Sequence, residues 1–263
     1  MPRKLSLLIL LILVAALGGC SGEYMLTTPD AVALPGQPAP AVVRLQRREL
    51  AGYIVPVRDV SLMFRVADQP MRAARTDKQG YAGVLLPAPS QPGRYDVIVH
   101  HQDTYAIVLQ GALSLYVLEP DRPVVAVDLD SLPLGGRGQA QEAIARLAEK
   151  ASLLYTTSGV TRADRAHGLL VGGGYPDGPV VPYARPRVFG YRNPLAPIDP
   201  SPLAAIKQHL PRLAWGVAAD DDSARAYRSA GVKVIGVRDG STRGHADVFI
   251  EKWEDLRAES IAD

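Results

Sequence analysis

Two carboxylates stand two residues apart at the end of a continuous apolar run. The segment 124–127 reads Val-Val-Ala-Val and leads into Asp128-Leu129-Asp130. Such a run is typical of a buried parallel strand, and charged side chains are rarely buried without a task. A pair of this kind can bind Mg²⁺ through oxygen, with one carboxylate as nucleophile and the other as acid and base. The spacing therefore predicts a site at this strand end.

The elements that must position these acids alternate between strand and helix patterns from about residue 122 onward. Strands are expected over 124–130, 152–157, 213–219 and 232–237, and helices over 139–150, 161–170, 201–210, 222–230 and 253–259. Thr161 and Ser201 are the expected N-caps of two of these helices. Alternation of this kind predicts a parallel sheet covered on both faces, with any site at the carboxyl ends of its strands.

The Asp128-Leu129-Asp130 pattern resembles the first motif of the haloacid dehalogenase superfamily, DxDx(T/V). Further segments follow in that family's order. Thr156-Thr157-Ser158 resembles its second motif, and Gly174-Tyr175-Pro176-Asp177-Gly178-Pro179 looks like the "GFPDGP" segment of lipin-type phosphatidate phosphatase domains. Lys207 precedes a strand as the third-motif lysine does, and the acids 220–222 follow that strand. The resemblance covers about residues 125–258 and implies an uncapped, Rossmann-like haloacid dehalogenase fold.

The chemistry that this resemblance implies is phosphoryl transfer through an aspartyl-phosphate. Asp128 would attack phosphorus and Asp130 would act as acid and base. Thr157 would hydrogen-bond a phosphate oxygen and Lys207 would neutralise charge. Mg²⁺ would be held by carboxylates among Asp128, Asp130, Asp220 and Asp221. The implied substrate is a phosphorylated small molecule or lipid, and an uncapped, open site suits a large or membrane-borne phosphate.

The sequence departs from the family pattern at several of these positions. Leu132 stands where the family has Thr or Val, and Gly159-Val160 replace an Arg-Pro pair. On a gapless alignment Ala219 and Ser223 replace the two metal-binding acids. The acids 220–222 can equally serve as a solvated helix start, because acids cap a helix well without any metal. Two hypotheses therefore stay open: an active phosphatase, and a catalytically decayed domain that acts as a binding or scaffold module.

The N-terminus predicts export. A basic start is followed by an apolar stretch over 5–17, which has the length of a signal-peptide core rather than of a membrane span. Gly18-Gly19-Cys20-Ser21 resembles the bacterial lipoprotein lipobox, which implies cleavage before Cys20 and lipidation of that residue. Cys20 is the only cysteine, so disulfides within one chain are excluded. We expect a lipid-anchored envelope protein, and Ser21 favours the periplasmic side of the outer membrane over the inner membrane.

Charge and composition describe an ordinary globular protein. The chain has 263 residues, 47% hydrophobic and 21% charged, with a formal charge of +2. Removing residues 1–19 takes away Arg3 and Lys4, which leaves 27 basic against 27 acidic residues. A neutral mature chain does not predict nucleic-acid binding, which needs dense phosphate contacts. We expect a signal peptide over 1–19, a Pro-rich tether over 20–41, a β-sandwich over 42–120 and the α/β domain over 121–263.

The expected β-sandwich rests on short β-type runs separated by turn residues. Strands are predicted over 42–45, 60–66, 81–86, 95–99 and 113–118. The turn 76–82 and the strand 93–99 resemble bacterial Ig-like or transthyretin-like modules, which implies an Ig-like sandwich whose partner stays open. His100 and His101 point to opposite faces of a strand and do not predict a metal site. His167, His209 and His245 are interpreted as surface or packing residues.

Overall fold

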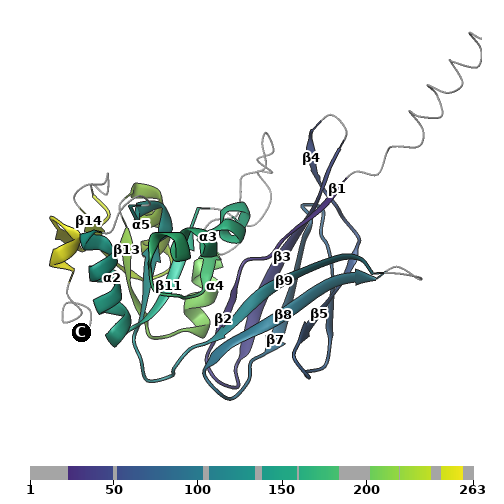
Figure 1. The fold of residues 1–263 in the computed structure, drawn as a ribbon, viewed down its shortest axis with the longest axis horizontal. Helices are drawn as coiled ribbons and strands as arrows, with labels where there is room; N and C mark the ends of the chain where they lie inside the picture. The colour runs from purple at the N-terminus through teal and green to yellow at the C-terminus, as the bar shows by residue number, and fades with distance from the viewer. Residues whose placement is uncertain are drawn as a thin grey trace, which may run out of the picture.

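The computed structural model describes residues 23–49, 52–102, 107–133, 138–158, 160–183, 202–218, 220–237 and 244–256. Cys20, the signal segment and Ser201 lie outside this part of the chain. Figure 1 shows a β-sandwich on one side and an α/β unit on the other. The predicted fold class, an all-β sandwich followed by a parallel α/β sheet, is confirmed by the pairing of the strands.

The sandwich consists of two sheets. One contains β1 (Glu23–Thr27), β3 (Pro38–Arg48), β4 (Ile54–Pro56) and β7 (Tyr81–Pro87), and the other contains β2 (Ala31–Ala33), β9 (Ile107–Val117), β8 (Gly93–Gln102), β5 (Ser61–Val66) and β6 (Arg72–Arg75). All pairs are antiparallel except β2 with β9. Alternating side chains such as Leu62, Phe64 and Val66 are buried between the sheets, as a half-buried strand requires.

The tether expected over 20–41 is wrong for the residues that the structure describes. Residues 23–41 contain β1, β2 and the first part of β3, and Ala31, Val32 and Ala33 are fully buried. The segment is rich in Pro and Ala and shows no clean alternation of apolar and polar residues, and this suggested a linker. Small side chains nevertheless suit the packed interior of the sandwich, and the strand pairing supplies the backbone hydrogen bonds. The sandwich therefore begins at Glu23.

The α/β unit is built on one parallel sheet of six strands. Their spatial order is β12 (Val180–Pro182), β11 (Ser152–Thr157), β10 (Val124–Asp128), β13 (Leu213–Ala218), β14 (Lys233–Val237) and β15 (Val248–Ile250). The helical elements are η1 (Leu129–Ser131), α2 (Gln139–Lys150), α3 (Val160–Gly173), α4 (Pro202–His209), α5 (Asp221–Ser229) and η2 (Trp253–Asp255). The sequence missed β12 and β15, since three residues are too few to show a pattern. It also placed Thr161 before a helix that already includes it.

Helices cover both faces of this sheet, as predicted. Apolar side chains of α2, α3 and η2 pack with Val125 and Val127 on one face. Those of α4 and α5 pack with Val124 and Ala126 on the other face. The alternation along β10 thus divides its side chains between two cores.

The second of these cores continues into the sandwich. Val32 of β2, Tyr116 of β9 and Leu118 join the same buried cluster as Leu203 and Tyr227. The two units therefore share apolar packing in addition to their peptide connection. No helix within the described ranges is long and apolar enough to cross a membrane.

Candidate functional site

The order in which the chain adds strands to the sheet reverses at β10. The connection from β10 leads to β11 on one side, while β13 pairs with the other side of β10. In parallel sheets of this order, ligands bind outside the carboxyl ends of the strands at this switch point. Asp128 is the last residue of β10. The predicted acid pair therefore lies where a ligand site of this fold is expected.

Asp128 is fully buried and forms hydrogen bonds within its own turn. Its carboxylate accepts from the backbone N–H of Asp130 at 3.2 Å and from Ser131 Oγ at 2.7 Å, so it caps η1. The pKa of Asp128 is raised to about 6, mainly by burial and also by the nearby charges of Asp220 and Asp130, while the Ser131 bond opposes the rise. Asp130 itself is exposed.

The three acids after β13 have separate environments. Asp220 is the N-cap of α5 and accepts from Ser223 N at 2.7 Å and from Ser223 Oγ at 3.0 Å. Asp222 is exposed and pairs with Arg225 at 2.8 Å. The Oδ1 atom of Asp221 is buried and has no hydrogen-bond partner among the described residues. Of these acids, Asp220 contributes to the raised pKa of Asp128 through its charge.

The two threonines of β11 lie on opposite faces of the strand. Thr156, not Thr157, is the register partner of Asp128. Its Oγ1 lies 2.6 Å from the hydroxyl of Tyr227 in a fully buried hydrogen bond. Thr157 follows on the opposite face of the strand, and within the described part of the chain its buried Oγ1 has no partner. Burial and the charge of Asp128 raise the pKa values of Tyr183 and Tyr227.

Lys207 lies away from this edge. It occupies the last turn of α4, and its Nζ donates to the carbonyl oxygen of Pro211 at 2.8 Å. Pro211 precedes β13, and the next residue, Arg212, accepts from Val124 N at the start of β10. Lys207 is therefore bound at the amino ends of the strands, and burial lowers its pKa. The expected role of this lysine in neutralising a ligand at the carboxyl edge does not agree with its position.

The predicted magnesium ligands are oxygen donors of a suitable kind, but they do not converge. No three His, Cys, Asp or Glu side chains in the described ranges gather into a set that could hold a metal ion. Asp128 and Asp220 use carboxylate oxygens as caps, and Asp130 is exposed. The arrangement of Asp128, Asp130, Asp220 and Asp221 therefore does not fit a magnesium site.

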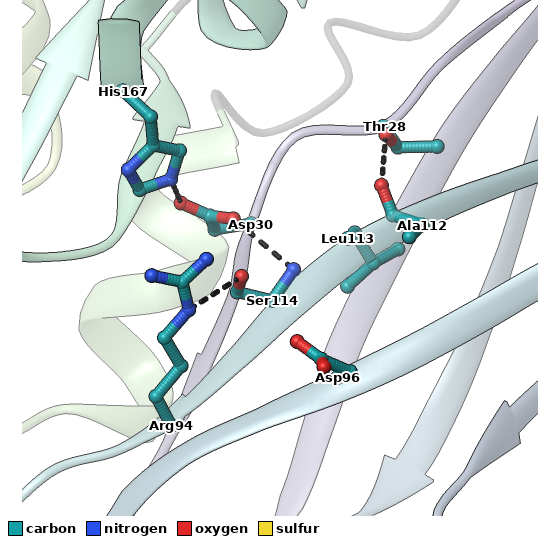
Figure 2. Close-up of a pocket in the computed structure, with 8 residues that line it drawn as sticks. All are labelled: Thr28, Asp30, Arg94, Asp96, Ala112, Leu113, Ser114 and His167. Carbon is teal, nitrogen blue, oxygen red and sulfur yellow. Dashed lines mark hydrogen bonds and ion pairs between the residues drawn. The ribbon is translucent and has the colours of Figure 1, made fainter.

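A second polar site lies between the sandwich and α3. Figure 2 shows a pocket of about 200 Å³, lined by Thr28, Asp30, Arg94, Asp96, Ala112, Leu113, Ser114 and His167. All but His167 come from the sandwich. The volume corresponds to roughly six or seven water molecules, so the pocket suits water or a small polar molecule.

Asp30 is the central acceptor of this site, with a side chain that is 5% exposed. It accepts from Val180 N at 2.8 Å, from Ser114 N at 3.2 Å and from His167 Nε2 at 2.7 Å. Its carboxylate thus binds the sandwich strand β9, the sheet strand β12 and helix α3 at once. The bond to Asp30 raises the pKa of His167 against the opposing effect of burial.

Asp177 forms the outer part of the same network. It accepts from the hydroxyl of Tyr116 at 3.1 Å, and it pairs with Arg94 at 3.6 Å and with His167 Nδ1 at 3.7 Å. The Tyr116 and His167 rings stack with their centroids 6.3 Å apart, and the guanidinium of Arg94 lies 5.7 Å from the centroid of the Tyr116 ring. Side chains of both units therefore hold each other in one charged cluster.

The sequence interpretation missed this cluster. It placed Asp30 in a tether and treated His167 as a surface or packing residue. Asp177 was noticed only as part of the segment 174–179. A single His on an amphipathic helix gives no signal of its acid partner 137 residues earlier. Only the docking of the two units brings these groups together.

Comparisons with known proteins add little beyond the fold. No protein-family model matches the chain, and no curated protein matches its sequence. Among solved structures, the D00–D0 domain of intimin matches with a TM-score of 0.25 and 18% identity, over 35% of this chain and 45% of that one. PhoD matches with a TM-score of 0.31 and 11% identity, over 78% of this chain and 44% of that one.

The β-glucuronidase of Parabacteroides merdae matches with a TM-score of 0.33 and 9% identity, over 86% of this chain and 35% of that one. The chain thus spans less than half the length of each of these structures. Similarity at this level carries no functional argument.

Proposed function

We propose that this chain is a lipid-anchored protein of the bacterial envelope. Its α/β unit binds a ligand at the carboxyl edge of the sheet and does not catalyse a reaction of that ligand. The hydrogen bonding of Asp128 carries the proposal. Both of its carboxylate oxygens accept from the turn that it caps, through Asp130 N and Ser131 Oγ. Hydrogen bonds accepted by a carboxylate stabilise the anion, so these two bonds hold Asp128 as the cap of its turn and make it a weaker nucleophile.

Charge supports a ligand that donates hydrogen bonds. The two charged groups that raise the pKa of Asp128 are the carboxylates of Asp220 and Asp130. A phosphate dianion would approach like charges at this edge, which costs free energy in a partly buried site. A hydroxyl or an ammonium group would instead donate to the carboxylates. The ligand class that fits is a polyol or an amine.

A second candidate is the phosphoester hydrolase that the haloacid dehalogenase resemblance implies. One observation favours it: with a pKa of about 6, Asp128 is mostly ionised at neutral pH, as a carboxylate nucleophile must be. Asp128 would form a bond to phosphorus, and Asp130 would protonate the departing alcohol oxygen. The position of Lys207 and the dispersed carboxylates weaken this candidate.

The two candidates are separated by measuring binding and turnover on the same preparations. Full-length protein is titrated with myo-inositol, spermidine or p-nitrophenyl phosphate, and thermal shift and phosphate release are recorded with and without Mg²⁺. We expect stabilisation by the polyol or the amine, lost in Asp128→Asn and kept in Asp222→Asn. Asp222 is the matched control because it is an exposed neighbour paired with Arg225.

Turnover would reverse the order of the candidates. Mg²⁺-dependent phosphate release that disappears in Asp128→Asn would establish the hydrolase. Absence of both stabilisation and turnover, with folded protein, would remove the ligand site and leave a scaffold role.

The envelope anchor is the other part of the proposal. It rests on the lipobox resemblance around Cys20, since the only cysteine stands where that motif requires it. The intact mass of the protein from a bacterial membrane fraction is expected to show loss of residues 1–19 and addition of acyl groups. Cys20→Ala should abolish that modification. An unmodified Cys20 would contradict the anchor without affecting the ligand site.

A further inference from the structure

Three strand ends lie side by side where the described chain begins. Glu23 of β1 is opposite Arg48 of β3, and Arg48 is opposite Ile54 of β4. Glu49 and Tyr53 close the β3–β4 connection, with Glu49 N bonded to Tyr53 O at 2.8 Å. Figure 1 shows the β4 hairpin and the start of β1 at the same end of the sandwich. We refer to this region as the sheet end.

Large side chains with apolar surface are exposed at the sheet end. Tyr53 is 72% exposed, Ile54 48% and Tyr24 42%. Tyr24 shares a face of the sheet with Arg47, whereas Ile54 shares the opposite face with Arg48, so the exposed side chains surround the end of the sheet. Large side chains exposed together at one end of a sheet indicate an interaction surface more strongly than singly scattered ones do.

The charges of the sheet end are paired with one another. Arg47 Nη2 contacts Glu49 Oε1 at 2.6 Å, and Arg48 Nη1 contacts Glu23 Oε2 at 3.4 Å. These four side chains carry no net charge. A partner that binds the sheet end therefore does not need to be anionic. Its exposed aromatic and aliphatic side chains suit the interface of a bilayer, where Tyr is enriched.

The covalent chain brings this region to the membrane. Only three peptide steps separate Cys20 from Glu23, which span at most about 11 Å. We propose that Tyr24, Tyr53 and Ile54 form a membrane-docking surface that inserts at the level of the lipid headgroups, with the sandwich directed away from the bilayer. This inference rests on the proposed lipid anchor at Cys20. The acyl chains would hold the protein, and the sheet end would fix its orientation.

The test measures depth at two exposed apolar positions of the same sheet. Tyr53→Cys and, in a separate protein, Leu85→Cys are labelled with a small fluorophore after purification of the full-length protein from membranes. Leu85 is the matched control: it is 57% exposed and lies opposite Pro40 of β3. Pro40 is eight residues from Arg48, or about 27 Å along the strand. The labelled proteins are placed in phosphatidylethanolamine–phosphatidylglycerol vesicles that contain nitroxide-labelled lipids.

We expect the label at position 53 to lose most of its fluorescence and the label at position 85 to lose none. The loss should persist in high salt and in phosphatidylcholine vesicles, because the charges are paired. Equal quenching at the two positions, with acylated Cys20 confirmed by intact mass, would overturn the docking surface alone. Unmodified Cys20 would overturn the anchor and the docking surface together. Ile54→Ser should reduce quenching at position 53 without loss of folding.

Discussion

Asp30 is the residue whose removal tests the contact between the two units most clearly. It lies in the loop between β1 and β2 and accepts hydrogen bonds from Val180 N, Ser114 N and His167 Nε2. Asp30→Asn keeps the shape of the side chain but replaces one acceptor oxygen by a donor. Whichever way the amide turns, at least one buried backbone N–H loses its acceptor.

The expected loss of stability follows from these contacts. Hydrogen bonds to a charged group contribute about 1.5–3 kcal/mol, and leaving a buried donor unsatisfied costs about 1–3 kcal/mol. Because the carboxylate is only 5% exposed, little water can replace the lost bond. We therefore expect Asp30→Asn to lower the free energy of unfolding by about 2–3 kcal/mol, a large part of the total for a typical domain.

Urea unfolding followed by two probes measures this effect. Tryptophan fluorescence reports on the α/β unit, because both tryptophans, Trp215 and Trp253, belong to it. Circular dichroism also reports on the sandwich. Wild-type protein is expected to show coincident transitions, and Asp30→Asn is expected to separate them. Asp96→Asn is the control, because Asp96 lines the same pocket, is exposed and makes no ion pair with any described residue.

A small effect would refute this account of the interface. If Asp30→Asn shifts the unfolding free energy no more than Asp96→Asn, within about 0.5 kcal/mol, then the three hydrogen bonds do not hold the units together. Separate transitions in the wild type would also contradict it, since they would mean that the units unfold independently.

Three further predictions concern pH and packing. Because the pKa of His167 is raised in the folded protein, its contribution to stability is fully present below a pH of about 6.5, the ordinary pKa of His, and is lost as pH rises through the folded pKa. His167→Gln should remove this part of the pH dependence of urea unfolding. Burial likewise raises the pKa of Asp128 from 3.8 to about 6, so stability from this group is lost as pH rises from about 4 to about 6 and changes no further above that. A shift of about two units corresponds to roughly 3 kcal/mol, and Asp128→Asn should therefore lose less stability than wild type between pH 4.5 and 7.5. In Gly216→Ala the new Cβ would lie 2.5 Å from the Tyr227 ring; we expect a loss of about 1–3 kcal/mol or more, and an unchanged melting temperature would contradict the packing.

The fold could be predicted from the sequence where patterns are long. The β-type run Val60–Val66, bounded by turn residues, predicted β5 although its alternation is only partial, and the period of Gln139–Lys150 predicted α2. The three-residue strands β12 and β15 are too short for such a pattern. Residues 23–41 were misassigned because their small and Pro-rich strands look like a linker until the second sheet is present to cover them.

The candidate site could be predicted only in part, for a related reason. The position of Asp128 follows from local sequence, since it ends a buried run. The direction in which the Lys207 side chain extends does not follow from local sequence, because it depends on the length of α4 and on the Pro211 carbonyl beside the last turn of that helix. The bond from Asp30 to His167 joins two units and leaves no trace in either segment.

The most direct test of the central claim is phosphate release from p-nitrophenyl phosphate by the full-length protein in the presence of Mg²⁺, compared with Asp128→Asn. We expect the same background release from both proteins, since Asp128 caps its own turn and Lys207 is bound at the opposite edge of the sheet. Release by the wild type that exceeds this background and vanishes in Asp128→Asn would contradict the claim.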